Sequence, residues 1–204
     1  MANVNHSSLT DPYLHEPKGI SAAAANKVYV SDGAASGSWK TVYTQGWEDY
    51  EDNATGAQAL TSGAWVDLTN DGAGSNTNKT YKLPGKGDVW NTSTNSFDFS
   101  DYIIGDTLEI RADVTFNTSA SNDLCALRID FAHGDAAEFP IEFFRESFKT
   151  AGNHKIAVSI PFYIGSAAVR DNPAKIAAFA DSASDTCTVN GWFIKAIPRS
   201  PVYN

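Results

Sequence analysis

Hydrophobic and polar residues alternate along three stretches in the second half of the chain. In the longest, charged or hydroxyl-bearing residues separate five apolar ones: Leu108, Ile110, Ala112, Val114 and Phe116. A period of two is typical of a β-strand that buries one face and leaves the other in water. The pattern recurs over residues 127–131 and 156–164. Pro161 lies on the opposite face of the last stretch, which indicates an edge strand or a bulge there.

Three further segments predict strands. Residues 64–68 form one short strand, and residues 174–180 fit either a strand or a short helix. We favour a strand for the second, because the acidic turn 181–185 follows at hairpin spacing. Residues 186–197 carry apolar side chains on both faces, Trp192 and Ile194 among them. Since each sheet of a single sandwich leaves one face in water, this last strand indicates a subunit interface.

The strand signals continue from about residue 44 onward. No segment of adequate length shows the i, i+3, i+4 spacing of an amphipathic helix. Roughly eight to ten strands are expected, a number that fits a β-sandwich or jelly roll. The sequence therefore predicts an all-β protein in which residues 44–204 form a jelly-roll β-sandwich.

Residues 1–43 differ from the rest in composition and hydrophobic pattern, and we interpret them as a separate N-terminal region. Residues 1–26 hold early prolines, a glycine and an alanine run, with too few large apolar residues for a core of their own. We expect an extended arm that becomes ordered on a partner. Residues 27–31 and 38–43 predict a β-hairpin around the turn cluster 32–37. An isolated hairpin is marginal in water, so this one must pack on the main domain, on sister subunits or on another protein.

Composition narrows the class of partner. Hydrophobic residues make up 42% of the chain and aromatic residues 12%, which is enough for a core. Acidic residues outnumber basic ones by 24 to 15, so the net charge of −9 disfavours nucleic acid and anionic membranes. No apolar run approaches the ~20 residues of a membrane span. The first residues lack the pattern of a signal peptide, and we expect folding in a cytoplasm. Cys125 and Cys187 lie in expected strands and are interpreted as small core residues, not as a disulfide.

Two loops carry residue types that could hold a metal ion. Asp67, Asp71 and Gly72 match positions one, five and six of an EF-hand calcium loop. Position twelve is Asn78 where that loop needs Glu, and strands flank the segment, so we favour a plain turn. A second group holds one histidine among three carboxylates: Asp130, His133, Asp135 and Glu138. A zinc site needs more nitrogen or sulfur ligands than this, and we favour a polar hairpin turn.

The remaining chemistry is sparse. The acidic run at residues 47–52 is interpreted as a solvated loop, with contact to a basic patch on a partner as the alternative. Neither a G-x-S-x-G nucleophile elbow nor a glycine-rich phosphate loop occurs. We expect no enzyme, no cofactor and no metal. A pair of carboxylates for glycoside hydrolysis can be remote in sequence, so that activity stays open.

Several short stretches carry a family resemblance. In the N-terminal region they are residues 14–20, the alanine run 22–25, residues 28–33 and residues 36–39. Further along they are residues 68–74, 83–84, 89–91, 97–99, 105–106, 110–111 and 189–192. Together these stretches resemble small tailed-bacteriophage virion proteins of the head-fibre, capsid-decoration or tail-fibre type. The resemblance implies a homotrimer of jelly rolls similar to tumour necrosis factor and C1q, and it brings no enzyme-site residue with it.

The resemblance and the sequence pattern together favour a structural function. The leading hypothesis is a homotrimeric capsid decoration or head-fibre protein, assembled in the host cytoplasm and located in the virion. Its arm would contact the major capsid protein or another virion protein through Tyr13, Leu14, His15, Pro17, Lys18, Gly19 and Ile20. The expected trimer interface contains Val28, Tyr29, Trp39, Trp192 and Ile194. The alternatives are a tail-fibre or receptor-binding tip that recognises a host surface glycan, and a carbohydrate-active enzyme or calcium-dependent lectin on the same sandwich.

Overall fold

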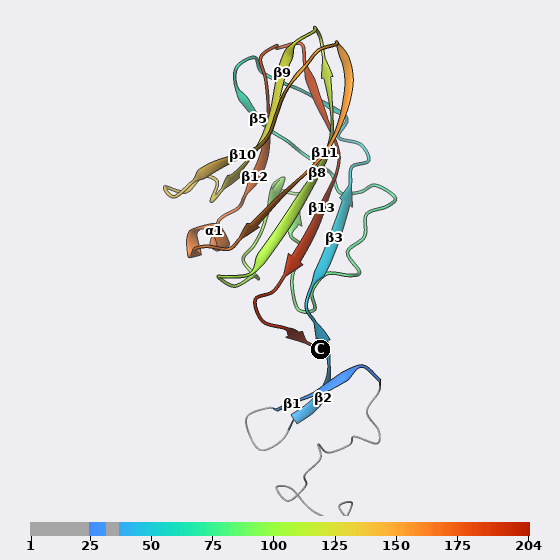
Figure 1. Ribbon diagram of the computed structural model, residues 1–204, viewed down its shortest axis with the longest axis vertical. Helices are drawn as coiled ribbons and strands as arrows, with labels where there is room; N and C mark the ends of the chain where they lie inside the picture. Colours follow the sequence, from blue (N-terminus) through green and yellow to red (C-terminus); the bar gives the residue numbers. More distant parts are fainter. Residues whose placement is uncertain (1–24, 32–36) are drawn as a thin grey trace, which may run out of the picture. The chain divides into compact units, whose positions relative to one another are not determined.

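The computed structural model describes residues 25–31 and 37–204 (Figure 1). The chain divides into two compact units, one of residues 45–200 and one of residues 1–44 together with 201–204. The sequence pattern predicts a boundary after residue 43 and does not indicate that the last four residues join the N-terminal unit.

The larger unit is a sandwich of two antiparallel sheets (Figure 1). One sheet has the order β11-β8-β13-β3, and the other has the order β10-β9-β12-β5. The strands are β3 (Gly46–Glu51), β5 (Trp65–Asp67), β8 (Thr107–Thr118), β9 (Asp123–Phe131), β10 (Phe139–Phe148), β11 (Gly152–Tyr163), β12 (Lys175–Ala180) and β13 (Thr186–Ile197). Nearly every connection crosses between the sheets, and this strand order is that of an eight-stranded jelly roll. The predicted fold class is therefore confirmed.

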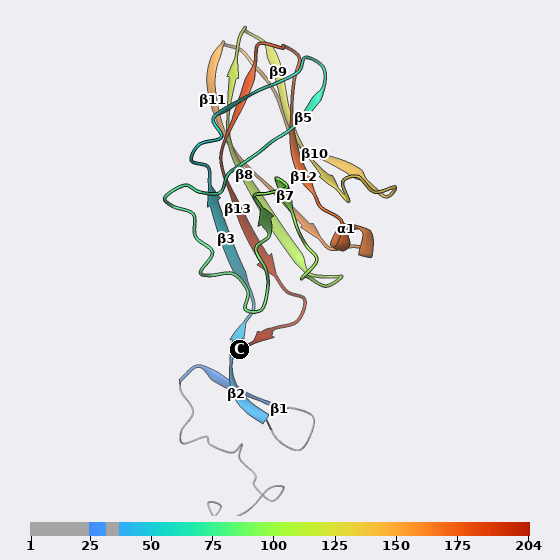
Figure 2. The ribbon, with the colours of Figure 1, turned by 180° about the vertical axis from the view of Figure 1, so that it is seen from behind.

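Smaller elements complete this unit. Strand β4 (Ala57–Ala59) pairs with β13, and the helix α1 (Ala167–Asp171) lies between β11 and β12. The long connection from β5 to β8 passes beside β3, where Asn78 and Asp49 form a β-bridge. That connection includes the short hairpin of β6 (Trp90–Asn91) and β7 (Ser96–Phe97), and β7 is visible from behind in Figure 2.

The alternation along β8 decides which side chains form the core. The five apolar residues named above are fully buried, and the charged residues between them reach the outer face. Leu127 and Ile129 of β9 approach them from the opposite sheet and are also fully buried. Burying one such side chain contributes about 1.5–3 kcal/mol. The alternation therefore also sets which face of each sheet points inward.

Pro161 lies on an edge strand, as its position in the sequence predicts. Among the described strands β11 pairs with β8 alone, and Pro161, opposite Glu109, faces outward. A missing N–H is tolerated at an edge. Strand β10 forms the edge of the other sheet and carries a bulge between Glu142 and Phe144. The expected edge position of residues 156–164 is confirmed.

The last long strand corrects one prediction about subunits. A bulge between Val189 and Gly191 shifts the alternation of β13 by one residue, so Val189, Trp192 and Ile194 all point into the core. If the strand is taken as regular, without the bulge, its apolar residues fall on both faces. The bulge moves these three to one face. Phe193, on the outer face, is covered by Trp47 of the same chain. Trp192 and Ile194 therefore offer no surface to a second subunit, and the reason for placing them at a trimer interface fails.

The acidic run at residues 47–52 is also different from the expectation. It forms β3 and is not a solvated loop: Glu48 and Tyr50 face the core and are buried, while Trp47, Asp49 and Glu51 face outward. The Glu48 carboxylate accepts hydrogen bonds from the Tyr50 hydroxyl and from the Val89 N–H, the latter at 3.1 Å. Burial raises the pKa of Glu48 above its ordinary value. The alternation with a period of two is hard to see in this sequence, because the segment is rich in acidic residues. Its inward positions are Glu48 and Tyr50.

Both cysteines are core residues, as predicted. Cys125 in β9 and Cys187 in β13 are buried free thiols. Burial raises the pKa of the Cys125 thiol to about 12, so the reactive thiolate form is disfavoured.

The smaller unit is a three-stranded sheet with the order β1-β2-β14. Its strands are β1 (Lys27–Ser31), β2 (Gly37–Tyr43) and β14 (Val202–Tyr203). The predicted hairpin is confirmed, and Tyr29 lies opposite Trp39 with the rings edge to face at 5.5 Å. None of the residues described in this unit is buried, and Val28 and Tyr203 are 41% and 46% exposed.

Candidate functional site

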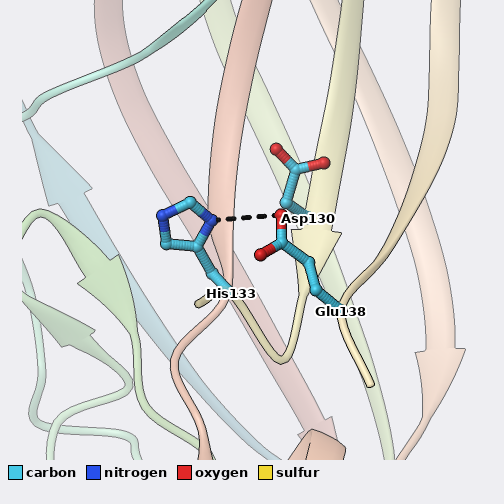
Figure 3. Close-up of side chains that lie close together, drawn as sticks. All are labelled: Asp130, His133 and Glu138. Atoms are coloured by element: carbon cyan, nitrogen blue, oxygen red, sulfur yellow. Dashed lines mark ion pairs between the residues drawn. The ribbon is translucent and has the colours of Figure 1, made fainter. Parts of the chain in front are cut away.

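The second of the two sequence candidates for a metal site is brought together, in part, at the hairpin between β9 and β10 (Figure 3). Asp130 is the last residue but one of β9, and His133 and Glu138 lie on the turn. One ligand atom from each lies within 4.8 Å of the others. The Nδ1 of His133 lies 3.5 Å from Glu138 Oε1, and its Nε2 lies 3.9 Å from Asp67 Oδ2. Asp135 is not part of the group, because its Oδ1 accepts the N–H of Ala137 at 2.8 Å.

An arginine and a lysine already pair with carboxylates of this cluster. Arg128 donates to Oδ2 of Asp130 from Nε at 3.1 Å and from Nη2 at 3.0 Å. Lys175 Nζ lies 2.9 Å from Asp67 Oδ2. Burial raises the pKa of Asp130, and the charge of Arg128 opposes that shift.

Three carboxylates are thus matched by an arginine, a lysine and a histidine. A single nitrogen ligand with its acids already paired is a poor zinc site. The arrangement favours the interpretation as a hairpin turn, held by ion pairs across β5, β9 and β12. Sequence spacing could group Asp130, His133 and Glu138 and places Arg128 two residues before Asp130. It could not reveal Lys175, which comes from β12.

In the loop at residues 67–72, which resembles a calcium site, the carboxylate oxygen atoms bind donors of the same chain. The Asp71 carboxylate accepts the N–H groups of Asn53, Ala54 and Ala73 at 2.9–3.0 Å. Asp67 faces Lys175 instead. Since backbone donors and a lysine occupy these carboxylates, the plain turn is favoured here too.

A pocket of about 390 Å³ opens between the edge strands β10 and β11 and helix α1. It is lined by Phe131, Phe139, Ile141, Pro161, Phe162, Tyr163, Gly165, Ser166 and Val169. The Ser166 hydroxyl caps α1 by accepting the Val169 N–H at 3.3 Å. No acid, histidine, lysine or arginine lines the pocket, so it offers no group for acid–base catalysis. The sequence signal for it was the apolar outward residues of two edge strands, Phe139, Ile141 and Tyr163.

The outer face of the five-stranded sheet carries a row of stacked rings. Tyr81 stacks on Trp47 at 4.8 Å, Trp47 stacks on Phe193 at 5.8 Å, and the Arg111 guanidinium lies 5.2 Å from the Phe193 ring. Trp47 contacts rings on both sides, whereas Tyr81, at the end of the row, is 58% exposed. The row therefore covers part of the outer face of the sheet and leaves Tyr81 as its open ring.

The remaining predicted site residues fall into two groups. The arm residues Tyr13, Leu14, His15, Pro17, Lys18, Gly19 and Ile20 lie outside the described residues. Val28, Tyr29 and Trp39 lie together on the small sheet. Among the described residues, no helix is long and apolar enough to cross a membrane.

Strand order defines the class, an all-β jelly-roll protein. A second pocket, of about 340 Å³, includes Asp98 and Asp171 in its lining. No protein-family model matches the chain, and no curated protein matches it either. Solved structures with a similar fold include Eiger TNF from S. frugiperda, at 9% identity and a TM-score of 0.41 over 76% of this chain and 93% of that one. The PRD1 vertex protein P5 is similar at 14% identity and 0.40, over 78% and 99%. A structure of infectious bursal disease virus, Gx strain, is similar at 9% identity and 0.43, over 84% and 36%.

Virus proteins and a tumour-necrosis-factor protein therefore stand among the structures this chain is similar to. Identities and TM-scores this low establish no family, and the fold assignment rests on the strand order described above.

Proposed function

We propose that this protein is a structural component of a virion: a homotrimeric capsid decoration or head-fibre protein, attached to the capsid by its N-terminal arm. The observation that supports this proposal most is the small sheet. It carries apolar and aromatic residues on all three strands, and the described part of the chain buries none of them.

A sheet this small does not supply its own stability. A small sheet needs a packed hydrophobic face to be stable. We propose that another chain covers Val28, Tyr29 and Trp39. Closed three-fold symmetry is one economical way to provide it, because each copy would cover the same residues on its neighbour.

The arm is proposed as the capsid contact. An extended segment gains affinity by adding a strand to an exposed sheet edge and by burying a few apolar anchors, here Tyr13, Leu14 and Ile20. Three arms on one trimer would multiply a modest single-site affinity through effective concentration. The jelly rolls would project from the capsid, and we propose no enzymatic activity for them.

The test of the arm uses trimers and empty capsids from the same phage. Deleting residues 1–26 should leave the trimer intact in sedimentation analysis and abolish co-sedimentation with the capsids. A sharper variant replaces Tyr13, Leu14 and Ile20 together by Ala, and its matched control replaces Ser7, Ser8 and Thr10 by Ala. Normal attachment of the deletion variant to the capsids would contradict the proposed role of the arm.

A receptor-binding tip is the second candidate, and the pocket beside α1 is the observation that favours it. Tyr163 at its rim is 68% exposed, as aromatic residues that contact sugars often are. The lining supplies few polar groups to orient hydroxyls, which ranks this candidate lower. Saturable binding on a glycan array that Tyr163→Ala removes would favour the tip over capsid decoration.

A further inference from the structure

A second acidic cluster lies at the other end of the sandwich, the upper end in Figure 1. It is formed where the β8–β9 connection meets the β12–β13 connection. One carboxylate oxygen from each of Asp123, Asp181 and Asp185 lies within 4.8 Å of the others. The loops are tied together by the Asp181 N–H, which donates to Leu124 O at 3.2 Å.

Each of the three carboxylates is fixed through one oxygen. Ala120 N–H donates to Asp123 Oδ2 at 2.8 Å, and Leu124 N–H donates to Asp181 Oδ1 at 2.9 Å. Ser119 N–H donates to Asp185 Oδ1 at 2.8 Å. The second oxygen of each accepts no hydrogen bond from the part of the chain that the structure describes. Three acids are thus held in place with lone pairs unused.

Asp185 points to a ligand independently of the clustering. Its side chain is fully buried, yet its Oδ2 has no hydrogen-bond partner in the described structure. A buried carboxylate oxygen that has lost its water and gained no donor is unfavourable. A bound cation would remove that imbalance.

The cluster at the β9–β10 hairpin shows the contrast. There the buried Asp130 also has one oxygen without a hydrogen bond, but that Oδ1 lies 2.8 Å from Arg128 Nε. Around Asp123, Asp181 and Asp185, no lysine, arginine or histidine of the described residues comes within ion-pair distance. One cluster contains its counter-charges and the other lacks them.

We propose that Asp123, Asp181 and Asp185 bind one calcium ion, which fastens the β8–β9 loop to the β12–β13 loop. Calcium takes six to eight oxygen ligands in flexible geometry, and magnesium demands a near-ideal octahedron. Two hydroxyls stand beside the carboxylates: Ser119 Oγ donates to Asp185 Oδ1 at 2.8 Å and lies 3.0 Å from Ser182 Oγ. The site offers only oxygen atoms, carried on two loops, as calcium prefers. It departs from the sequence expectation of no metal and does not depend on the virion role.

The test uses the full-length protein, stripped with EDTA and dialysed, in thermal unfolding with added calcium chloride. At a concentration about 100-fold above the dissociation constant, the melting temperature should rise by roughly 5–10 °C. Isothermal titration calorimetry should give one calcium per chain. Absence of both effects, or a larger effect of magnesium than of calcium, would overturn the proposal.

Asp181→Asn and Asp135→Asn make a matched pair of variants. Both aspartates are exposed loop residues that accept a backbone N–H, and Asn can still accept it. Asp181→Asn should weaken calcium binding at least tenfold. In the absence of calcium it should melt no lower than the unsubstituted protein, since it removes a repelling charge.

Asp135→Asn should respond to calcium like the unsubstituted protein. If Asp181→Asn responded to calcium as strongly as the unsubstituted protein does, the ion would bind elsewhere. A lower calcium-free melting temperature with an unchanged response would leave Asp181 a structural role only. Either result contradicts the site.

Discussion

The two units of this chain use similar residues to different ends. In the jelly roll, Trp192, Phe97 and Tyr50 are fully buried, with Trp192 and Phe97 in ring contact at 6.0 Å. In the small sheet, Tyr29 and Trp39 also touch, but neither they nor any other described residue there is buried. The first unit closes its own core, whereas the described residues of the second leave apolar side chains partly exposed. The proposed function assigns stability to the first unit and assembly to the second.

The largest expected effect separates the units by stability. Trp192→Ala removes a buried indole from between Trp90 and Phe97, and should lower the free energy of unfolding by about 3–5 kcal/mol. Denaturant unfolding followed by circular dichroism measures it. A loss below about 1 kcal/mol would mean that the jelly roll does not depend on this core.

The proposed trimer should respond to the small sheet instead. Trp39→Ala is expected to dissociate it while changing the unfolding free energy of the jelly roll by no more than about 0.5 kcal/mol. Sedimentation velocity measures the mass, and Ser38→Ala, an exposed change on the same strand, is the control. A trimer that survives Trp39→Ala unchanged would remove this ring from the interface.

The core of the larger unit also carries a pH dependence. Burial raises the pKa of Glu48 in the folded state above its value in the unfolded chain. The folded state then holds its proton more tightly, so this contribution to stability is full below the unfolded pKa. It is lost as the pH rises through the folded pKa.

Glu48→Gln tests that dependence. The neutral amide should flatten the loss of stability above pH 4.5 and stabilise the protein by about 1 kcal/mol at pH 8, because no buried charge remains. Unfolding free energies from pH 4 to pH 8 measure it. An unchanged pH slope would assign the dependence to other groups.

The smallest effect concerns the charged cluster at the β9–β10 hairpin. Lys175→Ala breaks a partly exposed ion pair with Asp67 and should cost about 0.5–1 kcal/mol, decreasing at high salt. Thermal unfolding at low and high salt measures it. A loss of several kcal/mol would show that the cluster is a larger determinant of the fold than its exposure indicates.

Most strands could be predicted from the sequence because their alternation is undisturbed. Residues 108–116 and 127–131 both lie in the strands expected of them. The misses have local physical causes. The bulge between Val189 and Gly191 changes which residues of β13 face the core. Glu48 is buried, although a glutamate in an acidic run predicts a solvent-exposed position.

Sites were harder to predict than strands because their residues come from distant loops. Asp130, His133 and Glu138 are close in sequence and could be grouped, whereas Lys175, which pairs with Asp67 beside them, comes from another strand. Asp123 and Asp185 meet only because two loops share one end of the sandwich. No spacing rule connects residues so far apart.

The central claim is that the small sheet is covered by other copies of the chain. Sedimentation equilibrium of the full-length protein at micromolar concentration tests it most directly. The account predicts a single species of three times the 21.9 kDa chain mass. A stable species of one chain mass, with the small sheet protected from hydrogen exchange, would contradict it.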